Sequence, residues 1–239
     1  MTPSRVAAVV PCKDEADRIA ATVRAVAALP AVGRVVVVDD GSTDPTSAVA
    51  RAAGADVVRH ERNRGKAAAL ETGVAHLREL ETRAGEDPAP LLFVDGDLED
   101  TAGNLGVLTD AVLSGEADMT IATLPAQRTS GGGRGLVVGL ARDGIEQLTG
   151  FRAVQPLSGM RCLSPGAASA AAPLARGWGV ETALTVDVLR AGLTVREVPC
   201  ELQHRVSGSD WRGQLHRAGQ YRDVWLALVQ RGWRPWHRA

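Results

Sequence analysis

The chain has 239 residues, of which 45% are hydrophobic and 23% are charged, as in an ordinary globular protein. Its 27 basic and 28 acidic residues give a formal net charge of −1, so the overall charge does not indicate a nucleic-acid-binding protein. This length suffices for one α/β domain with a substantial core, and we expect residues 1–239 to form a single domain.

Three cysteines, Cys12, Cys162 and Cys200, are far apart and form no Cys-x-x-Cys motif, which predicts buried thiols in a reducing compartment. Residues 1–10 lack the long apolar core of a secretory signal, and no stretch approaches the roughly 20 apolar residues that a membrane helix needs. We therefore predict a cytoplasmic protein.

Short apolar runs alternate along the chain with longer segments of helical spacing. Runs rich in β-branched residues and without polar alternation predict parallel strands that are covered on both faces. The expected strands are Arg5–Val10, Arg34–Val38, Asp56–Val58, Leu91–Val94 and Asp118–Ala122, and the expected helices are Asp14–Leu29, Pro45–Ala53 (with Asp44 as its N-cap), Arg64–Leu80 and Thr101–Ser114. The alternation predicts an α/β fold with an open, doubly wound, mainly parallel sheet and helices on both faces. Ligands of such sheets bind beyond the carboxyl ends of the strands.

Two carboxylates separated by one glycine, Asp95-Gly96-Asp97, follow the apolar run Leu91–Val94. A glycine here lets the chain turn, so that both carboxylates can approach one ligand. Their hard oxygen donors suit Mg²⁺ or Mn²⁺. Taken alone, the same three residues are more typical of a plain turn.

Two earlier loops combine acids with hydroxyl groups, and a third combines glycine with cations. Pro11–Glu15 and Asp39–Asp44 follow the first two strands and suit the hydroxyl and N–H groups of a nucleoside, although Asp39–Asp44 also reads as a capped turn. Asn63-Arg64-Gly65-Lys66 opens a helix, where backbone N–H groups and a lysine favour a phosphate over an ordinary solvated helix start.

In their order and spacing these four segments resemble the signatures of family 2 glycosyltransferases with the GT-A fold. The resemblance implies that residues 1–123 form a nucleotide-binding half and residues 124–239 an acceptor-binding half with a helical tail. It implies that Asp97 holds a divalent ion on the donor diphosphate. The implied contacts to the nucleotide sugar are Pro11, Lys13, Glu15, Asp39, Asp40, Ser42, Asn63, Lys66 and Asp95.

The second half resembles glucosyl-3-phosphoglycerate synthases. The shared segments are Gly131-Gly132-Gly133-Arg134, Gln155-Pro156-Leu157-Ser158-Gly159, Gly177-x-Gly179-Val180-Glu181 and His204-Arg205. This resemblance implies that Gly133, Arg134, Ser158 and Gly159 bind the acceptor, that Glu181 lies beside it, and that His204 completes the metal site. Physically, Arg134 can pair with an anion and neutral His204 can bind a metal. Alternatively, His204 is a surface residue and Glu181 only stabilises a helix dipole.

The acceptor loop differs from that of the synthases. Gly135 and Leu136 follow Arg134 and supply no hydroxyl where the synthases have a threonine, so 3-phosphoglycerate is not assured as the acceptor. Similar loops occur in enzymes that resemble polyprenyl-phosphate glycosyltransferases, which usually need a membrane.

The carboxyl-terminal tail bears on that alternative. It contains four of the five tryptophans, and from Glu201 onward seven arginines face three acids. A helix of this kind binds anionic membranes, but Trp225, Leu226, Leu228 and Val229 also suit the buried face of a closing helix. We favour packing and leave open peripheral contact with the inner face of the membrane.

We therefore predict a glycosyltransferase that depends on Mg²⁺ or Mn²⁺ and moves a sugar from a UDP- or GDP-sugar to a hydroxyl or phosphate acceptor. Asp97 and His204 hold the ion, Asp95 contacts the ion or the donor sugar, and Glu181 orients or deprotonates the acceptor. Retention and inversion both stay open. Two alternatives are a nucleotidyltransferase, which usually carries a glycine-rich basic loop after its first strand, and a non-catalytic sugar-nucleotide-binding module.

Overall fold

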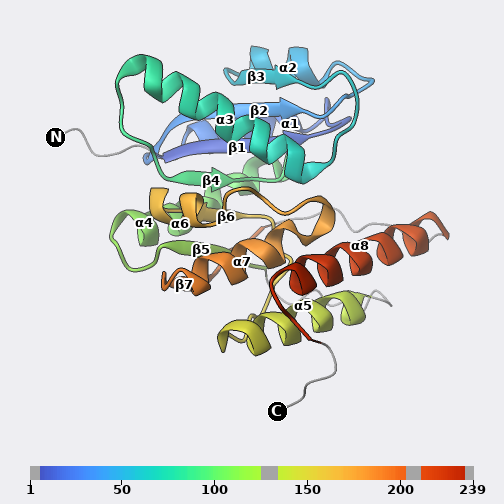
Figure 1. Cartoon of the computed structure of the whole chain (residues 1–239). Helices are drawn as coiled ribbons and strands as arrows, with labels where there is room; N and C mark the ends of the chain where they lie inside the picture. Colours follow the sequence, from blue (N-terminus) through green and yellow to red (C-terminus); the bar gives the residue numbers. More distant parts are fainter. Residues whose placement is uncertain (1–5, 125–133, 203–210, 235–239) are drawn as a thin grey trace.

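A computed structural model describes residues 6–124, 134–202 and 211–234; the side chains of Arg134 and of residues 211–217 are outside the description. Seven strands form one sheet in the order β3-β2-β1-β4-β6-β5-β7 (Figure 1). The strands are β1 (Val6–Cys12), β2 (Val32–Asp39), β3 (Asp56–Arg59), β4 (Leu91–Phe93), β5 (Met119–Thr123), β6 (Arg161–Leu163) and β7 (Val195–Pro199). Neighbouring strands are parallel except at β6, which runs antiparallel to both β4 and β5. The predicted α/β class and mainly parallel sheet are confirmed.

Helices cover both faces of the sheet. They are α1 (Ile19–Ala27), α2 (Thr46–Ala52), α3 (Lys66–Ala84), α4 (Gly106–Leu113), α5 (Arg134–Thr149), α6 (Pro165–Ala170), α7 (Val180–Arg190) and α8 (Trp211–Gln230), with 3-10 helices η1 (Glu99–Leu105) and η2 (Gly177–Gly179). In Figure 1, α3 and α7 lie in front of the sheet and α1 lies behind it.

The burial of alternate residues explains why the strands read as continuous apolar runs. Along β1, Val6, Ala8 and Val10 pack in the core on the side of α1 and α4, whereas Ala7 and Val9 pack in the core on the side of α3 and α7. A strand that is covered on both faces needs apolar residues at every position.

All five predicted strands and the helices between them are present, but some boundaries differ. The first helix begins at Ile19 instead of Asp14, because residues 13–18 form a loop that is bonded to the next loop. The helix expected over Thr101–Ser114 is divided into η1 and α4. The second helix begins at Thr46, and Asp44 accepts a hydrogen bond from the Thr46 N–H at 3.0 Å.

The expected closing helix is α8, although its buried face differs from our expectation. Leu228 is buried, whereas Trp225 and Leu226 are 37% and 40% exposed. The helix instead turns Val224 and Leu228 toward a small core shared with α5 and α7, and buries Ala227 against Gly179. The three cysteines are buried and unpaired as predicted. Among the described residues, no helix is both long and apolar enough to cross a bilayer.

Candidate active site at the carboxyl edge of the sheet

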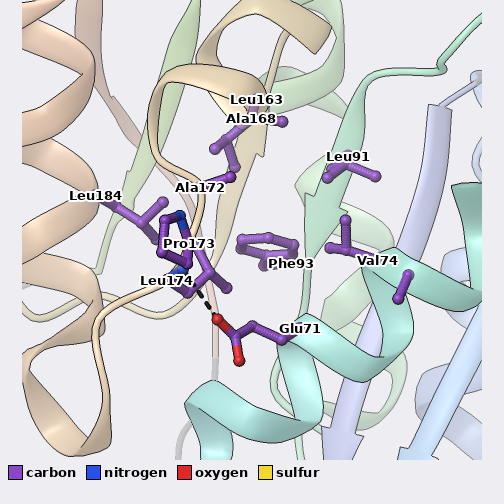
Figure 2. A pocket seen from close by; sticks show the side chains of 11 residues that line it. Glu71, Val74, Leu91, Phe93, Leu163, Ala168, Ala172, Pro173, Leu174 and Leu184 are labelled. Carbon is purple, nitrogen blue, oxygen red and sulfur yellow. Dashed lines mark hydrogen bonds between the residues drawn. The ribbon is translucent and has the colours of Figure 1, made fainter.

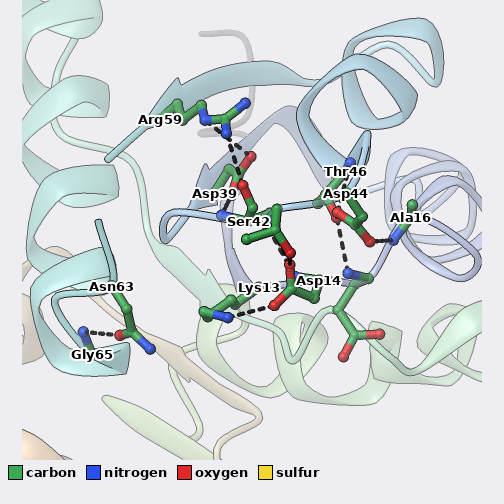
Figure 3. Close-up of polar contacts among 12 residues, drawn as sticks. Lys13, Asp14, Ala16, Asp39, Ser42, Asp44, Thr46, Arg59, Asn63 and Gly65 are labelled. Carbon is green, nitrogen blue, oxygen red and sulfur yellow. Dashed lines mark hydrogen bonds and ion pairs between the residues drawn. The ribbon is translucent and has the colours of Figure 1, made fainter. Parts of the chain in front are cut away.

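The loops that follow β1 and β2 lie side by side and are bonded to each other (Figure 3). Ser42 Oγ accepts a hydrogen bond from the Asp14 N–H at 2.9 Å, and Asp14 Oδ1 accepts one from the Thr43 N–H at 2.7 Å. Thr46 Oγ1 accepts a third from the Glu15 N–H at 2.9 Å. The proximity that we expected from the sequence is therefore present, and the acids and hydroxyls of both loops fix their shape.

Asp39 and Asp40 face into the protein. Asp39 is fully buried and accepts hydrogen bonds from the Ser42 N–H, at 2.8 Å, and from the Ser47 hydroxyl. Asp40 accepts bonds from the N–H groups of Arg64 and Gly65, both at 2.8 Å. Both acids accept hydrogen bonds from main-chain N–H groups. A direct contact to a nucleotide stays a prediction for both.

His60, which the sequence analysis did not single out, completes the Asp40 cluster. Its Nδ1 donates to Asp40 Oδ1 at 2.7 Å, and its Nε2 lies 2.9 Å from Thr72 Oγ1. Asn63 Oδ1 accepts from the Gly65 N–H at 2.9 Å. The Asn63–Lys66 segment is thus bonded by Asp40, the residue after β2, and Asp40 is in turn bonded by His60, the residue after β3.

One ammonium group joins three separate elements at this edge. Lys66, the first residue of α3, places Nζ 2.6 Å from Asp95 Oδ1 and 3.3 Å from Glu181 Oε1. Burial disfavours the charged form, but the carboxylates of Asp95 and Glu181 outweigh it and raise the pKa of Lys66 above its ordinary value. The cation is therefore present at neutral pH.

Gly159 packs against this cluster. A Cβ at position 159 would lie 2.3 Å from Lys66 Nζ and 2.9 Å from Asp95 Oδ1. The register explains this contact, since antiparallel β6 pairs Arg161 with Phe93, and two residues beyond each lie Gly159 and Asp95. The predicted acceptor residue Gly159 and the predicted donor residue Asp95 therefore meet.

Arg161 holds the loop that carries Gly159. It is fully buried and donates from Nε to the Ser158 carbonyl at 2.9 Å, from Nη2 to the Pro156 carbonyl at 2.9 Å and from Nη1 to Thr185 Oγ1 at 2.8 Å. Burial lowers the pKa of Arg161 to about 10, against the opposing charges of Glu181 and Glu197. The sequence analysis missed this residue, although an arginine inside the apolar run Met160–Leu163 is a signal of a buried, bonded charge.

Gln155 and Glu197 fix the other end of the same loop. The Gln155 side chain bonds both the N–H and the carbonyl of Leu124, at 2.9 and 2.7 Å. Glu197 on β7 accepts from the Gln155 N–H at 2.7 Å. Ser158, the other predicted acceptor residue of this loop, is buried, and its hydroxyl has no hydrogen-bond partner among the described residues.

Glu181 lies in the first turn of α7, as the sequence predicted. The two glycines that precede it allow α8 to approach: a Cβ at Gly177 would lie 2.1 Å from Asp223 Oδ2, and one at Gly179 would lie 2.6 Å from the Asp223 carbonyl oxygen. Asp223 also accepts from the Trp178 N–H at 3.2 Å. The Gly-x-Gly motif therefore anchors the helix that presents Glu181.

Asp97 lies on the turn after β4, close to the first loop. Gly96 has no positive φ, contrary to the reason that we gave for it; a Cβ there would lie 2.8 Å from Cys12 Cβ and 3.5 Å from the Pro11 carbonyl oxygen. The glycine thus permits close packing.

Arg18 lies among several acids at this turn. It donates from Nε to Glu15 Oε2 at 2.8 Å, and this bond, with the charges of Glu15, Asp97 and Glu99, raises the pKa of Arg18.

The remaining predicted residues are placed as follows. Pro11 pairs with Val38 within the sheet, and Lys13 pairs with neighbouring Asp14. Arg134 begins α5, and Gly133 and His204 lie outside the described residues. Within the described ranges, no group of three or more His, Cys, Asp or Glu residues is arranged to hold a metal ion. The Asp97–His204 pair stays a prediction.

An apolar pocket of about 270 Å³ shares no lining residue with this polar cluster (Figure 2). It is lined from α3, β4, β6, the 168–174 segment and α7, and its one charged side chain, Glu71, accepts from the Leu174 N–H at 3.1 Å. With one carboxylate already bonded to backbone, the pocket does not offer the convergent ionisable groups that catalysis needs. The polar edge is the candidate active site.

Residues 7–158 match glycosyl transferase family 2, and the protein belongs to that family. The chain resembles glucosyl-3-phosphoglycerate synthase from Mycobacterium tuberculosis, solved in complex with Mn²⁺, uridine diphosphate (UDP) and glucosyl-3-phosphoglycerate, with a TM-score of 0.73 and 26% identity over 95% of this chain and 80% of that one. The complex of that synthase with Mg²⁺ and UDP also gives a TM-score of 0.73 and 26% identity, over 95% of this chain and 79% of that one.

The succinoglycan biosynthesis protein ExoU of Rhizobium meliloti (strain 1021) is 45% identical over 78 residues, which are 30% of this chain and 23% of that protein. The chain thus matches less than a quarter of that curated relative. Both resemblances predicted from the sequence are confirmed.

The close approach of the second loop to the third gives a prediction about stability. Gly41 has a φ of +73°, and a Cβ there would lie 2.6 Å from the Arg62 carbonyl carbon and 2.7 Å from the Asn63 nitrogen. We expect Gly41→Ala to lower the free energy of unfolding by about 2–5 kcal/mol, through left-handed strain and overpacking together. Chemical denaturation measures this change.

Gly85→Ala is the matched control, since Gly85 has a φ of +66° and no atom within 4 Å of its Cβ position. This substitution should lower the free energy of unfolding only by the cost of the left-handed conformation, about 1–2 kcal/mol. Equal losses in the two variants would contradict the packing role of Gly41.

Proposed function

We propose that the protein transfers a sugar from a UDP-sugar to a small phosphorylated acceptor, with Mn²⁺ or Mg²⁺ bound through Asp97. One observation carries the proposal: Lys66, Asp95, Gly159 and Glu181, from both halves of a family 2 chain, meet at the carboxyl edge of the sheet. Ligands of open α/β sheets bind at such an edge. The choice of UDP rests on the synthase complexes, which contain it.

The start of α3 supports a diphosphate site. Gly65 and Lys66 begin a helix of 19 residues, whose N-cap is a glycine and has no side chain to bond the N–H groups of the first turn. Backbone N–H groups at a helix N-terminus and a nearby ammonium both favour phosphate oxygens. Lys66 would thus bind the donor diphosphate, and Asp95, its partner, the donor ribose or sugar.

The turn after β4 fits a divalent ion. Mg²⁺ and Mn²⁺ accept one or two carboxylates together with substrate phosphates, and Asp95 and Asp97 supply two on one short turn. We assign Asp97 as the protein ligand from this turn and His204 as the second. When bound, the ion neutralises the charge that develops on the departing nucleoside diphosphate.

Glu181 is the candidate for orienting or deprotonating the acceptor. Its carboxylate is nearly buried and lies 3.3 Å from Lys66 Nζ, an ion pair that fixes the carboxylate at the edge where the acceptor would bind. Arg134, Gly133, Ser158 and Gly159 are proposed to bind the acceptor, with Arg134 pairing with its phosphate.

The central test is transfer or hydrolysis from a panel of UDP- and GDP-sugars with and without Mn²⁺ or Mg²⁺. We expect turnover of a UDP-sugar only with metal, and we expect Asp97→Ala to lower kcat/KM by about 10²–10³-fold, because the charge on the leaving group is no longer neutralised. Asp110→Ala, on the exposed side of α4, is the control and should match wild type. Metal-independent turnover would contradict the mechanism.

A second prediction concerns the ammonium between the two acids. Lys66→Met removes the ammonium that we propose to bind the donor diphosphate, so kcat/KM for the UDP-sugar should fall about 10²–10³-fold. Lys66→Arg keeps the charge and should lose less activity. An unchanged kcat/KM in Lys66→Met would contradict the role of Lys66 at the diphosphate.

A lipid-phosphate acceptor is the second candidate, favoured by exposed apolar side chains on α5 and α8. Leu136 is 75% exposed, and Trp225 and Leu226 are 37% and 40% exposed. This candidate predicts sedimentation with anionic liposomes, and loss of that sedimentation in a Trp225→Ser, Leu226→Ser double variant. The matched control, Val107→Ser with Leu113→Ser on α4, removes similarly exposed apolar groups elsewhere. If the wild-type protein stays in the supernatant, the lipid-phosphate acceptor is contradicted and the small phosphorylated acceptor is kept.

A further inference from the structure

The turn that carries Asp95 and Asp97 is held from α1 by one buried side chain. Thr22 is fully buried, and its Oγ1 donates to the Gly96 carbonyl at 3.0 Å and accepts from the Glu99 N–H at 2.8 Å. A hydroxyl has one hydrogen and two lone pairs, so a single threonine can make both bonds. The Arg18 carbonyl, at 3.5 Å, is the weaker competitor for the hydrogen.

The two bonds bracket Asp97. Gly96 immediately precedes it, and Glu99 lies two residues after it, so the backbone on each side of this carboxylate is bonded to the same hydroxyl. Glu99 has a φ of 51°, a left-handed conformation that a non-glycine residue adopts at a cost and that the surrounding structure must stabilise. The bond to Thr22 satisfies the N–H of this strained residue.

The opposite side of the turn is fixed by packing. Gly96 lies against Cys12 and Pro11 at the end of β1. The turn is therefore held between a strand end and a helix, and Thr22 supplies the hydrogen bonds that packing alone cannot. Backbone that is held in this way presents its side chains in one orientation.

We propose that Thr22 is a positioning residue for the divalent ion, acting through the backbone on both sides of Asp97. This inference rests on the proposed function. A metal site needs its ligands to be held within a fraction of an ångström, and loss of the supporting hydrogen bonds typically weakens metal affinity 10–100-fold. Thr22 itself touches neither ion nor substrate.

The test measures Mn²⁺ affinity in the presence of UDP by isothermal titration calorimetry, beside the metal dependence of turnover. We expect Thr22→Val, which keeps the shape and removes both hydrogen bonds, to weaken Mn²⁺ binding about 10–100-fold. Thr22→Ser keeps the hydroxyl and should stay within about threefold of wild type, inside the range expected when the supporting bonds are kept.

Thr109→Val is the matched control. Thr109 is also fully buried, and its hydroxyl donates only to the Gly106 carbonyl of its own helix, at 2.8 Å. It should lose thermal stability as Thr22→Val does, with no change in Mn²⁺ affinity. An equal effect of both substitutions on Mn²⁺ binding, or a Thr22→Ser variant as weak as Thr22→Val, would overturn the positioning role.

Wild type separates the two proposals. If wild type does not bind Mn²⁺ with UDP, the proposed function fails and the role of Thr22 fails with it. If wild type binds and Thr22→Val binds equally well, only the role of Thr22 is overturned. If Thr22→Val does not fold, hydrogen exchange of the Glu99 amide in wild type decides. Strong protection supports the hydrogen bond from the Glu99 N–H to Thr22, and fast exchange overturns it.

Discussion

The candidate site is organised around the ammonium of Lys66. It lies between Asp95, which follows β4, and Glu181, in the first turn of α7, and so joins the two halves of the chain. The lysine supplies one positive charge to two carboxylates that lie close together. The absence of a side chain at Gly159 leaves space for it.

The acids around this contact act mostly as acceptors for backbone. Asp40 and Asp44 each accept at least one main-chain N–H from a neighbouring loop, and Asp39 accepts one from Ser42 in its own loop. Turns leave N–H groups without partners in a helix or strand, and buried groups of this kind need an acceptor. The result is an edge whose loops are fixed to one another by their own acids.

The antiparallel strand β6 brings the second half of the chain to this edge. In a parallel sheet only the residues after a strand reach the carboxyl edge, whereas β6 runs the opposite way, so the residues before it do. Buried Arg161, at the start of β6, then holds the loop that precedes it by bonding the Pro156 and Ser158 carbonyls. The fold thereby brings residues of the second half of the chain to the carboxyl edge of the sheet.

The sequence alone determined the first half of the fold and the class of the site. Long β-branched runs such as Val35–Val38 predict a strand wherever they lie, and acids directly after them predict the carboxyl edge. These signals are local, so they need no knowledge of what packs against them. The order of the four segments then sufficed for the family resemblance.

Only the tertiary structure decided which residues meet. β6 has three residues, one of them an arginine, which is too short and too polar for a pattern to predict. The bonds of Thr22 to Gly96 and Glu99 span more than 70 residues of chain, as does the contact of Lys66 with Glu181. Such contacts depend on strand direction and helix placement, and these are set by the burial of the whole core and not by any local run of residues.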